Sequence, residues 1–193
     1  MEFISMANQD RALRADAIRS EEALLEAAKI VFSTDGVDAP ARQIATAAGV
    51  GVGTLYRRFP KRSDLVAAVF RREVDACVLE AETLRAQYPA DEALERWLKR
   101  YTAFIATKKG LAGALHSGDP AFADLPDYFR LRFEPTLAAL LAAASEQGAV
   151  RGDIAAYDLL RAVGNLSSAG GEDGNAHVAR MVDLLIDGLR RRG

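Results

Sequence analysis

Apolar residues recur along most of the chain at the three- and four-residue spacing of amphipathic helices. The first clear case places Leu24, Ala28 and Val31 on one side of a helix, with charged residues on the other. The pair Asp35-Gly36 ends this helix, because glycine readily adopts the left-handed conformation of a helix C-cap. No run of strand length alternates β-branched and polar residues, so the sequence predicts an all-α fold.

The same pattern continues along the chain and predicts about nine helices. Ser63-Asp64 and Asp153 are candidate N-caps, and Pro40 suits a first helical turn. Residues 1–19 are polar and mixed, so we expect a flexible arm that becomes helical near Asp16. The expected helices span residues 20–35, 40–49, 51–59, 63–87, 91–108, a short piece of 110–126, 127–147, 153–168 and 176–191.

Composition narrows the class of protein. Half of the residues are hydrophobic, which is enough for a core and argues against global disorder. The one cysteine, Cys77, excludes an internal disulfide framework, and it fits a core or surface position better than a nucleophile. His116 and His177 belong to no carboxylate–histidine motif, so no metal and no cofactor is expected. The sequence shows no export signal and no run long enough to span a membrane, so we expect a cytoplasmic protein without membrane association.

The net charge of −2 hides an uneven distribution of charge. No acidic residue lies between Asp38 and Asp64, whereas five basic residues do. We call these five residues the basic window: Arg42, Arg57, Arg58, Lys61 and Arg62. Such a local excess is typical of a surface that binds nucleic acid, although a solvated basic face explains the charge equally well.

The segment from Gln43 to Phe59 has the features of a helix-turn-helix. Two short helices that cross steeply need a small residue at their contact, which Ala45 supplies, and an abrupt turn, which Gly49 supplies. The outward side chains are small, hydroxylated or basic, which suits close approach to DNA and contacts to phosphate or guanine. The predicted DNA-binding residues are Arg42, Gly51, Val52, Gly53, Thr54, Tyr56, Arg57, Arg58, Lys61 and Arg62.

The stretch Glu22–Leu65 resembles the N-terminal domain of TetR-family transcriptional regulators. The matching residues are Phe32, Gly36, Ile44-Ala45, Ala48-Gly49-Val50, Gly53-Thr54-Leu55-Tyr56, Phe59, Arg62 and Leu65. The resemblance implies that the helix from Gly51 is the recognition helix and that Thr54, Tyr56 and Arg62 contact phosphates. It also implies three segments: a flexible arm (1–19), a three-helix helix-turn-helix domain (20–64) and a larger helical ligand-binding and dimerisation domain (65–193).

Two positions depart from the family pattern. Pro40 stands where the second helix commonly opens with Ser or Thr, so we expect that one hydroxyl–phosphate bond is missing here. Arg58 stands where His or an aromatic residue often precedes the Phe, so the family's readout is not carried over to this position. Tyr56 is open to two roles, contact with phosphate and packing of its ring between helices. Leu55 and Phe59 are expected in the core.

Seven aromatic residues lie between Trp97 and Phe133. Aromatic side chains at helical spacing form either an ordinary core or the wall of a mainly apolar pocket. A TetR-like plan places a cavity among these central helices, so the resemblance implies a small-molecule inducer. The candidate pocket residues are Trp97, Tyr101, Phe104, His116, Phe122, Phe129 and Phe133.

The last two predicted helices are each apolar on one face. They either close the core of their own subunit or pair with a second copy. Because repressors of this kind bind paired, palindromic half-sites as symmetric dimers, we expect a homodimer through these helices. The candidate interface residues are Leu159, Val163, Leu166, Met181, Val182, Leu185 and Leu189.

These observations predict a sequence-specific regulator that binds a double-stranded DNA operator, namely a repressor released by a small apolar ligand. An enzyme is the first alternative, but no Gly-x-Ser-x-Gly motif, phosphate loop or pair of metal ligands occurs in the sequence. A helical protein–protein adaptor is the second alternative, in which the basic window is incidental. Binding to bulk DNA at low salt separates the adaptor from the regulator.

Overall fold

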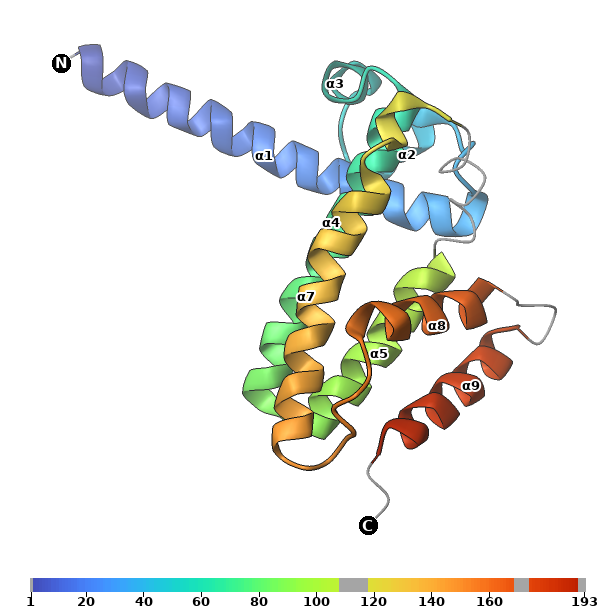
Figure 1. Cartoon of the computed structure of the whole chain (residues 1–193). Coiled ribbons are helices and arrows are strands. Elements are labelled where there is room, and N and C mark those ends of the chain that lie inside the picture. The colour runs from blue at the N-terminus through green and yellow to red at the C-terminus, as the bar shows by residue number, and fades with distance from the viewer. Residues whose placement is uncertain (1, 108–117, 169–173, 191–193) are drawn as a thin grey trace. The chain divides into compact units, whose positions relative to one another are not determined.

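The computed structural model describes residues 2–107, 118–168 and 174–190. Within these ranges the chain forms eight α-helices, one short 3-10 helix and no strand, which confirms the all-α prediction (Figure 1). The elements are α1 (Glu2–Asp35), α2 (Ala41–Ala47), α3 (Val52–Arg58), α4 (Arg62–Gln87), α5 (Ala90–Thr107), η2 (Pro120–Phe122), α7 (Leu125–Glu146), α8 (Ala156–Ser168) and α9 (Gly174–Leu189).

The N-terminal helix differs from the expected one in length. α1 begins at Glu2, so it continues through the segment for which the sequence led us to expect a flexible arm. Residues 2–19 contain neither proline nor glycine and are rich in alanine and arginine, which have high helix propensity. Polarity alone therefore gave the wrong secondary structure for this segment.

The starts of two other helices also differ from the sequence-based expectation. α4 begins at Arg62, and the carboxylate of Asp64 accepts a hydrogen bond of 3.1 Å from the backbone N–H of Lys61, as in half of a capping box. α8 begins at Ala156, so Asp153 is not its cap. The carboxylate of Asp153 instead binds the guanidinium of Arg151 at 2.5 and 2.6 Å, and this contact lowers its pKa.

The first of two compact units contains α1, α2, α3, η2 and the beginning of α4 up to Val69. α2 packs against both α1 and α3. The core of the unit holds apolar side chains from each of its four α-helices, including Leu24, Ile44, Leu55 and Val66, each at most 3% exposed. The boundary of this unit lies inside α4, a few residues beyond the domain end expected at residue 64. The unit also includes η2, which comes later in the chain.

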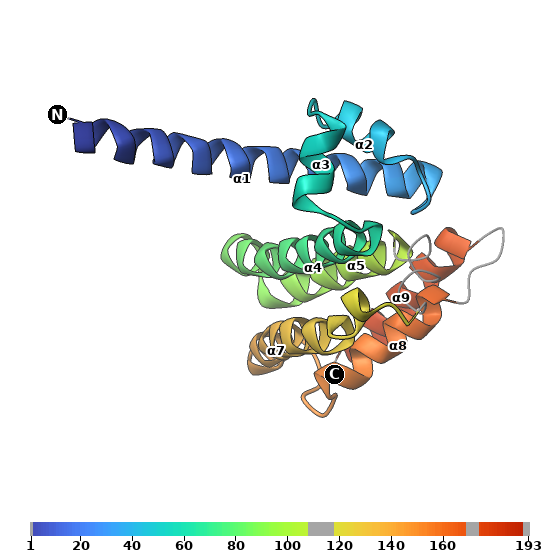
Figure 2. The ribbon, with the colours of Figure 1, turned by 90° about the horizontal axis from the view of Figure 1, so that it is seen from above.

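The second unit contains α4 from Phe70 onward together with α5, α7, α8 and α9. α5 packs against α7, α8 and α9, while α8 also packs against α7 and α9 (Figure 2). At its centre, the rings of Trp97 and Tyr101 stack with centroids 5.6 Å apart, and Phe133 meets Tyr101 edge-on at 5.3 Å. The buried polar atoms of these rings are paired: the Trp97 indole donates to the Cys77 carbonyl at 2.9 Å and the Tyr101 hydroxyl to the Leu160 carbonyl at 3.3 Å.

The single cysteine is part of this core. Cys77 is fully buried, and burial raises the pKa of its thiol to about 12. Because the thiolate is the nucleophilic form, a thiol that stays protonated at neutral pH is unreactive. The structure therefore agrees with the packing role expected for this residue.

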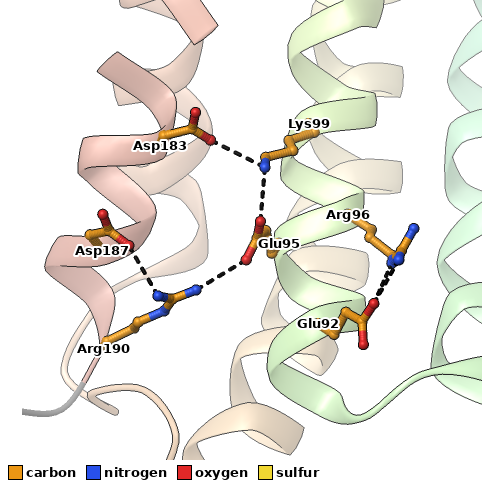
Figure 3. A network of polar contacts seen from close by, with 7 residues as sticks. All are labelled: Glu92, Glu95, Arg96, Lys99, Asp183, Asp187 and Arg190. Carbon is orange, nitrogen blue, oxygen red and sulfur yellow. Dashed lines mark hydrogen bonds and ion pairs between the residues drawn. The ribbon is translucent and has the colours of Figure 1, made fainter. Parts of the chain in front are cut away.

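Ion pairs join α9 to α5 along one edge of the second unit (Figure 3). The ammonium of Lys99 lies 2.8 Å from Glu95 and 3.2 Å from Asp183, and these contacts raise the pKa of Lys99. The guanidinium of Arg190 lies 3.2 Å from both Glu95 and Asp187. In addition, the backbone N–H of Arg151 donates to the Leu189 carbonyl at 2.9 Å. Polar contacts thus connect α9 to α5 within one chain, and because the paired side chains are exposed or half-exposed, each ion pair adds little stability.

Candidate nucleic-acid interface

The turn between α2 and α3 has the geometry that the sequence predicts for a helix-turn-helix. α2 ends at Ala47 with Ala48 as its C-cap, and Gly49 then adopts a φ of +68°, the left-handed conformation. The next residue, Val50, turns back and donates from its N–H to the Ala45 carbonyl at 3.0 Å. Ala45 itself is 1% exposed, so a small side chain lies where the helices meet. The turn therefore closes one helix and starts the next within four residues.

The outer face of α3 carries the side chains expected to meet DNA. Gly53, Tyr56, Arg57 and Arg58 are exposed, whereas Leu55 is buried as the sequence predicted. Tyr56 is 53% exposed, which favours contact with an external partner over packing of its ring between helices. The remaining positions of the segment divide as follows: Val52 and Thr54 are half-buried, Gly51 is exposed as the N-cap residue, and Phe59 is buried.

The basic window does not present all five charges in the same way. Arg42, Arg57 and Lys61 are exposed to solvent. Arg57 donates to the Thr54 hydroxyl at 3.3 Å, a contact within the surface of α3. The other two arginines bind groups of the chain itself.

Arg58 links α3 to α1. Its guanidinium lies 2.9 Å from the carboxylate of Glu21 and donates to the Ala17 carbonyl at 3.1 Å. Both partners of the ion pair keep about 40% of their side chains exposed, so water screens the pair and its contribution to stability is small. The charge of Arg58 is nevertheless partly neutralised where the sequence alone assigned it to DNA.

Arg62 is exposed as well, and its guanidinium also binds the backbone of its own unit. The two terminal nitrogens of its guanidinium donate to the carbonyl of Val37 and, at 2.6 Å, to the carbonyl of Ala39. These carbonyls belong to the connection between α1 and α2. The resemblance implied a phosphate contact at this position, and the structure shows an additional, internal role.

The residues expected to line a ligand pocket lie mainly in the core of the second unit. Trp97, Tyr101, Phe104 and Phe133 are each at most 2% exposed, and their rings contact one another. Phe129 joins them, with its centroid 4.7 Å from that of Phe133. Phe122 is buried in η2 and belongs to the first unit, and His116 lies outside the described residues. The packing of these rings favours the ordinary-core alternative over an open pocket.

The expected dimer residues divide into two groups. Val163 and Val182 are at most 2% exposed within a single chain, so these side chains close the core of their own unit rather than reach a partner. The other members line a cavity of about 540 Å³ between α8 and α9, and two of them, Leu159 and Leu189, are also buried, at 4% and 5% exposed. Those members are Leu159, Leu166, Met181, Leu185 and Leu189.

We call this cavity the α8–α9 groove. Four of its nonpolar residues were not among the interface residues that the sequence predicted. Leu184 is 64% exposed, and it follows Met181 and precedes Gly188 at helical spacing. The same spacing that identified Met181 and Leu185 therefore also pointed to Leu184 and Gly188. The other two unassigned residues are Ile154 and Ala162.

The part of the chain that the structure describes contains neither a membrane-spanning helix nor a metal site. No helix within it is long and apolar enough to cross a membrane. No group of three or more His, Cys, Asp or Glu residues within it is arranged to hold a metal ion.

Known families match both parts of the chain. Residues 24–69 match the model described as "Bacterial regulatory proteins, tetR family", and residues 89–191 match "Transcriptional regulator SbtR-like, C-terminal domain". A curated relative, an HTH-type transcriptional regulator of Staphylococcus aureus, is 29% identical over 109 residues. That match covers 55% of this chain and 59% of the relative, so it spans little more than half of each protein.

Solved structures match over nearly the whole chain. The TetR transcriptional regulator SCO0520 of Streptomyces coelicolor is 37% identical, with a TM-score of 0.75 over 90% of this chain and 99% of that one. The TetR transcription regulatory protein of Mycobacterium vanbaalenii is 34% identical, with a TM-score of 0.72 over 93% and 99%. At this coverage, both likenesses include residues of the two units described above.

The left-handed turn gives a prediction with an internal control. Replacing Gly49 by Ala is expected to lower the free energy of unfolding by about 1–2 kcal/mol, because a Cβ disfavours the left-handed conformation. Replacing Gly53 by Ala is expected to raise it by about 0.5–1 kcal/mol, because this glycine lies inside α3. A Cβ at Gly53 would meet no atom within 4 Å. Urea unfolding followed by circular dichroism measures both changes, and a shift of the same sign in both variants would contradict the assignment of the turn.

Proposed function

The chain belongs to the TetR family of transcriptional regulators, and on this premise we propose that it binds a DNA operator through α3 and represses transcription there. Regulators of this family are transcription factors and not enzymes, in agreement with the absence of catalytic motifs from the sequence. The proposal assigns α3 to the major groove, with the two copies of a homodimer on paired half-sites.

The observation that carries the proposal is the exposed face of α3 and its surroundings. This face offers a hydroxyl at Tyr56, a backbone open to close approach at Gly53 and the guanidinium of Arg57. Arg42 and Lys61 lie exposed on either side in the sequence, and no carboxylate interrupts residues 39–63. A surface of this kind attracts phosphates over its whole extent, while the small and hydroxylated groups permit contact with base edges.

The DNA contact is tested by salt dependence. Replacing Arg57 or Lys61 by Ala should weaken binding to a random-sequence DNA duplex and reduce the slope of log K against log salt by about 1 for each phosphate that is no longer neutralised. Replacing Tyr56 by Phe should weaken binding without changing the slope, because a neutral hydroxyl releases no counterion. Fluorescence anisotropy at several salt concentrations measures both quantities.

Arg85, an exposed arginine near the end of α4, is the matched control for this series. Its replacement by Ala should leave both the affinity and the slope unchanged. Equal effects at Arg85 and Arg57 would place the DNA surface elsewhere. A wild-type protein that does not bind the duplex even at low salt would support the adaptor alternative instead.

The α8–α9 groove supports the homodimer part of the proposal. Leu184 is exposed, and the half-buried Leu166, Met181 and Leu185 lie with it in the groove, so together they offer an apolar patch. Large exposed apolar patches on soluble proteins mark interaction sites, and a symmetric pairing of this groove with its copy would bury it. Two copies of α3 would then meet two half-sites.

Leu184→Glu should therefore dissociate the homodimer and leave the subunit folded, because this side chain is exposed in the single chain. Leu131→Glu is the control: Leu131 is 75% exposed on α7, outside the groove, and its replacement should leave the dimer intact. Val182→Glu should instead unfold the subunit, because it buries an unpaired charge. Analytical ultracentrifugation distinguishes these results, and a monomeric wild type at micromolar concentration would contradict the dimer.

We also propose that a small, largely apolar ligand releases the repressor. The support for an apolar ligand is the concentration of aromatic side chains in the second unit. A regulator of this fold from Saccharomonospora viridis was crystallised in complex with choline, a small cation, so the fold supports a small ligand but not its apolar character. That protein is 19% identical, so the likeness concerns the fold alone. Because Trp97, Tyr101 and Phe133 are packed together, a ligand would bind by separating rings that touch one another in the structure.

Linkage supplies the test of this ligand. A compound found by thermal shift should bind more weakly when the DNA is present, and DNA should bind more weakly by the same factor when the compound is present, typically about 5- to 150-fold. Phe104→Ala should weaken ligand binding if the site lies at the aromatic cluster. A compound that binds equally well with and without DNA is not an inducer.

A further inference from the structure

The start of α2 lacks the side-chain contact that usually fixes a helix N-terminus. Its N-cap position is occupied by Pro40, at φ −59° and ψ 135°, and no side chain forms a capping hydrogen bond there. The first turn of α2 also contains no acidic residue that would favour the positive end of the helix dipole. The first N–H groups of a helix have no partner within the helix, so the position of α2 needs support from elsewhere.

Arg62 supplies contacts at this point from the first residue of α4. Its guanidinium donates to the carbonyls of Val37 and Ala39, which lie two residues apart in the connection before Pro40. Ala39 is 4% exposed, and its N–H donates to the Gly36 carbonyl at 3.2 Å, so the connection is a closed turn. A planar guanidinium holds two N–H donors in a fixed fork, which suits two carbonyls at once.

A second contact closes the same connection from its other side. The side-chain amide of Gln43, in the first turn of α2, donates to the carboxylate of Asp35 at the end of α1. The Gln43 backbone N–H donates to the Pro40 carbonyl at 2.9 Å. Arg62 and Gln43 therefore both bind the segment that joins α1 to α2, and α2 leads into the turn at Gly49 that begins α3.

We propose that Arg62 is a positioning residue, which holds the connection between α1 and α2 and so places α2 and α3 for DNA binding, and that this role rather than phosphate neutralisation is its contribution to affinity. The inference rests on the proposed function, because it concerns how the DNA-binding face is held. A Ser or Thr at position 40 would accept a hydrogen bond from an N–H of the first turn of α2, whereas Arg62 donates to carbonyls of the connection before that turn. The two contacts differ in chemistry, but both would hold the start of α2 in place.

The experiment compares Arg62→Lys, Arg62→Gln and Lys61→Ala on a random-sequence DNA duplex over a series of salt concentrations. Lysine keeps the charge but replaces the planar fork by a single ammonium group. If Arg62 positions the helices, both Arg62 variants should lose affinity by about five- to tenfold, the factor that corresponds to the loss of a helix cap, with an unchanged salt slope. Lys61→Ala should reduce the slope by about 1. Thermal unfolding defines a temperature at which all variants are folded.

Amide hydrogen exchange without DNA provides the second measurement. Residues 36–44 should exchange faster in both Arg62 variants than in wild type, and should be unchanged in Lys61→Ala, because the guanidinium of Arg62 is the group that binds this connection. If Arg62→Lys retains wild-type affinity and exchange while Arg62→Gln reduces the slope by about 1, Arg62 is a phosphate contact and the proposal is overturned. A wild type without affinity for DNA would overturn the proposed function, and the exchange data would still show whether Arg62 holds the connection.

A rescue variant separates positioning from a general loss of stability. Pro40→Ser introduces a side-chain acceptor at the N-cap of α2. It should recover more DNA affinity in the Arg62→Gln background than it adds to wild type, because the hydroxyl and the guanidinium support the same helix start. Equal effects of Pro40→Ser in the two backgrounds would show that the two residues act independently, which contradicts the proposal.

Discussion

The turn at Gly49 is the constraint on which the proposed DNA-binding face depends. With its φ of +68° the chain leaves α2 and starts α3 at once, and the Val50 N–H finds the Ala45 carbonyl as its partner. Leu55 then lies in the core of the first unit, and the opposite side of α3 is turned to solvent. The exposure of Tyr56 thus follows from the backbone conformation of the short turn at Gly49, together with the burial of Leu55 and Ala45. Every side chain assigned to DNA on α3 owes its direction to this turn.

Positive charge near this face has two different uses. All four basic residues from Arg57 to Arg62 are exposed, but Arg58 also binds Glu21 and Arg62 also binds two carbonyls. A guanidinium is well suited to both tasks, because it offers several donors without the possibility of deprotonation. The carboxylate of Glu21 partly neutralises Arg58, whereas the carbonyls occupy donors of Arg62 and leave its charge in place.

Much of the fold followed from the spacing of apolar residues, because buried helix faces repeat every three to four positions. The buried positions Leu24, Ile44 and Leu55 and the turn at Gly49 were predictable in this way. Contacts between distant residues were not: Arg58 meets a carbonyl 41 positions away, and Arg62 meets carbonyls 23 and 25 positions away. No local pattern encodes such pairs.

Periodicity also left open which apolar side of α9 the chain itself buries. Val182 and Leu184 lie two residues apart on α9 and are both apolar, yet one is 2% and the other 64% exposed. An apolar residue shows that a helix face is favourable to bury, but not what buries it. The packing of α5 and α8 against α9 shows which face of α9 is covered within the chain. The division of the expected interface residues into core and groove follows from this limit.

The burial of Cys77 has a practical consequence for measuring conformational change by site-specific labelling. It is the one thiol in the chain, it is inaccessible, and its proton is retained far above neutral pH. A thiolate must attack a maleimide for labelling to occur, so the buried, protonated Cys77 of the wild-type protein should not react. A single cysteine introduced on the solvent side of α3 would then carry a fluorophore or spin label alone, and the separation of the two labels in an assembled pair would report the spacing of the recognition helices directly.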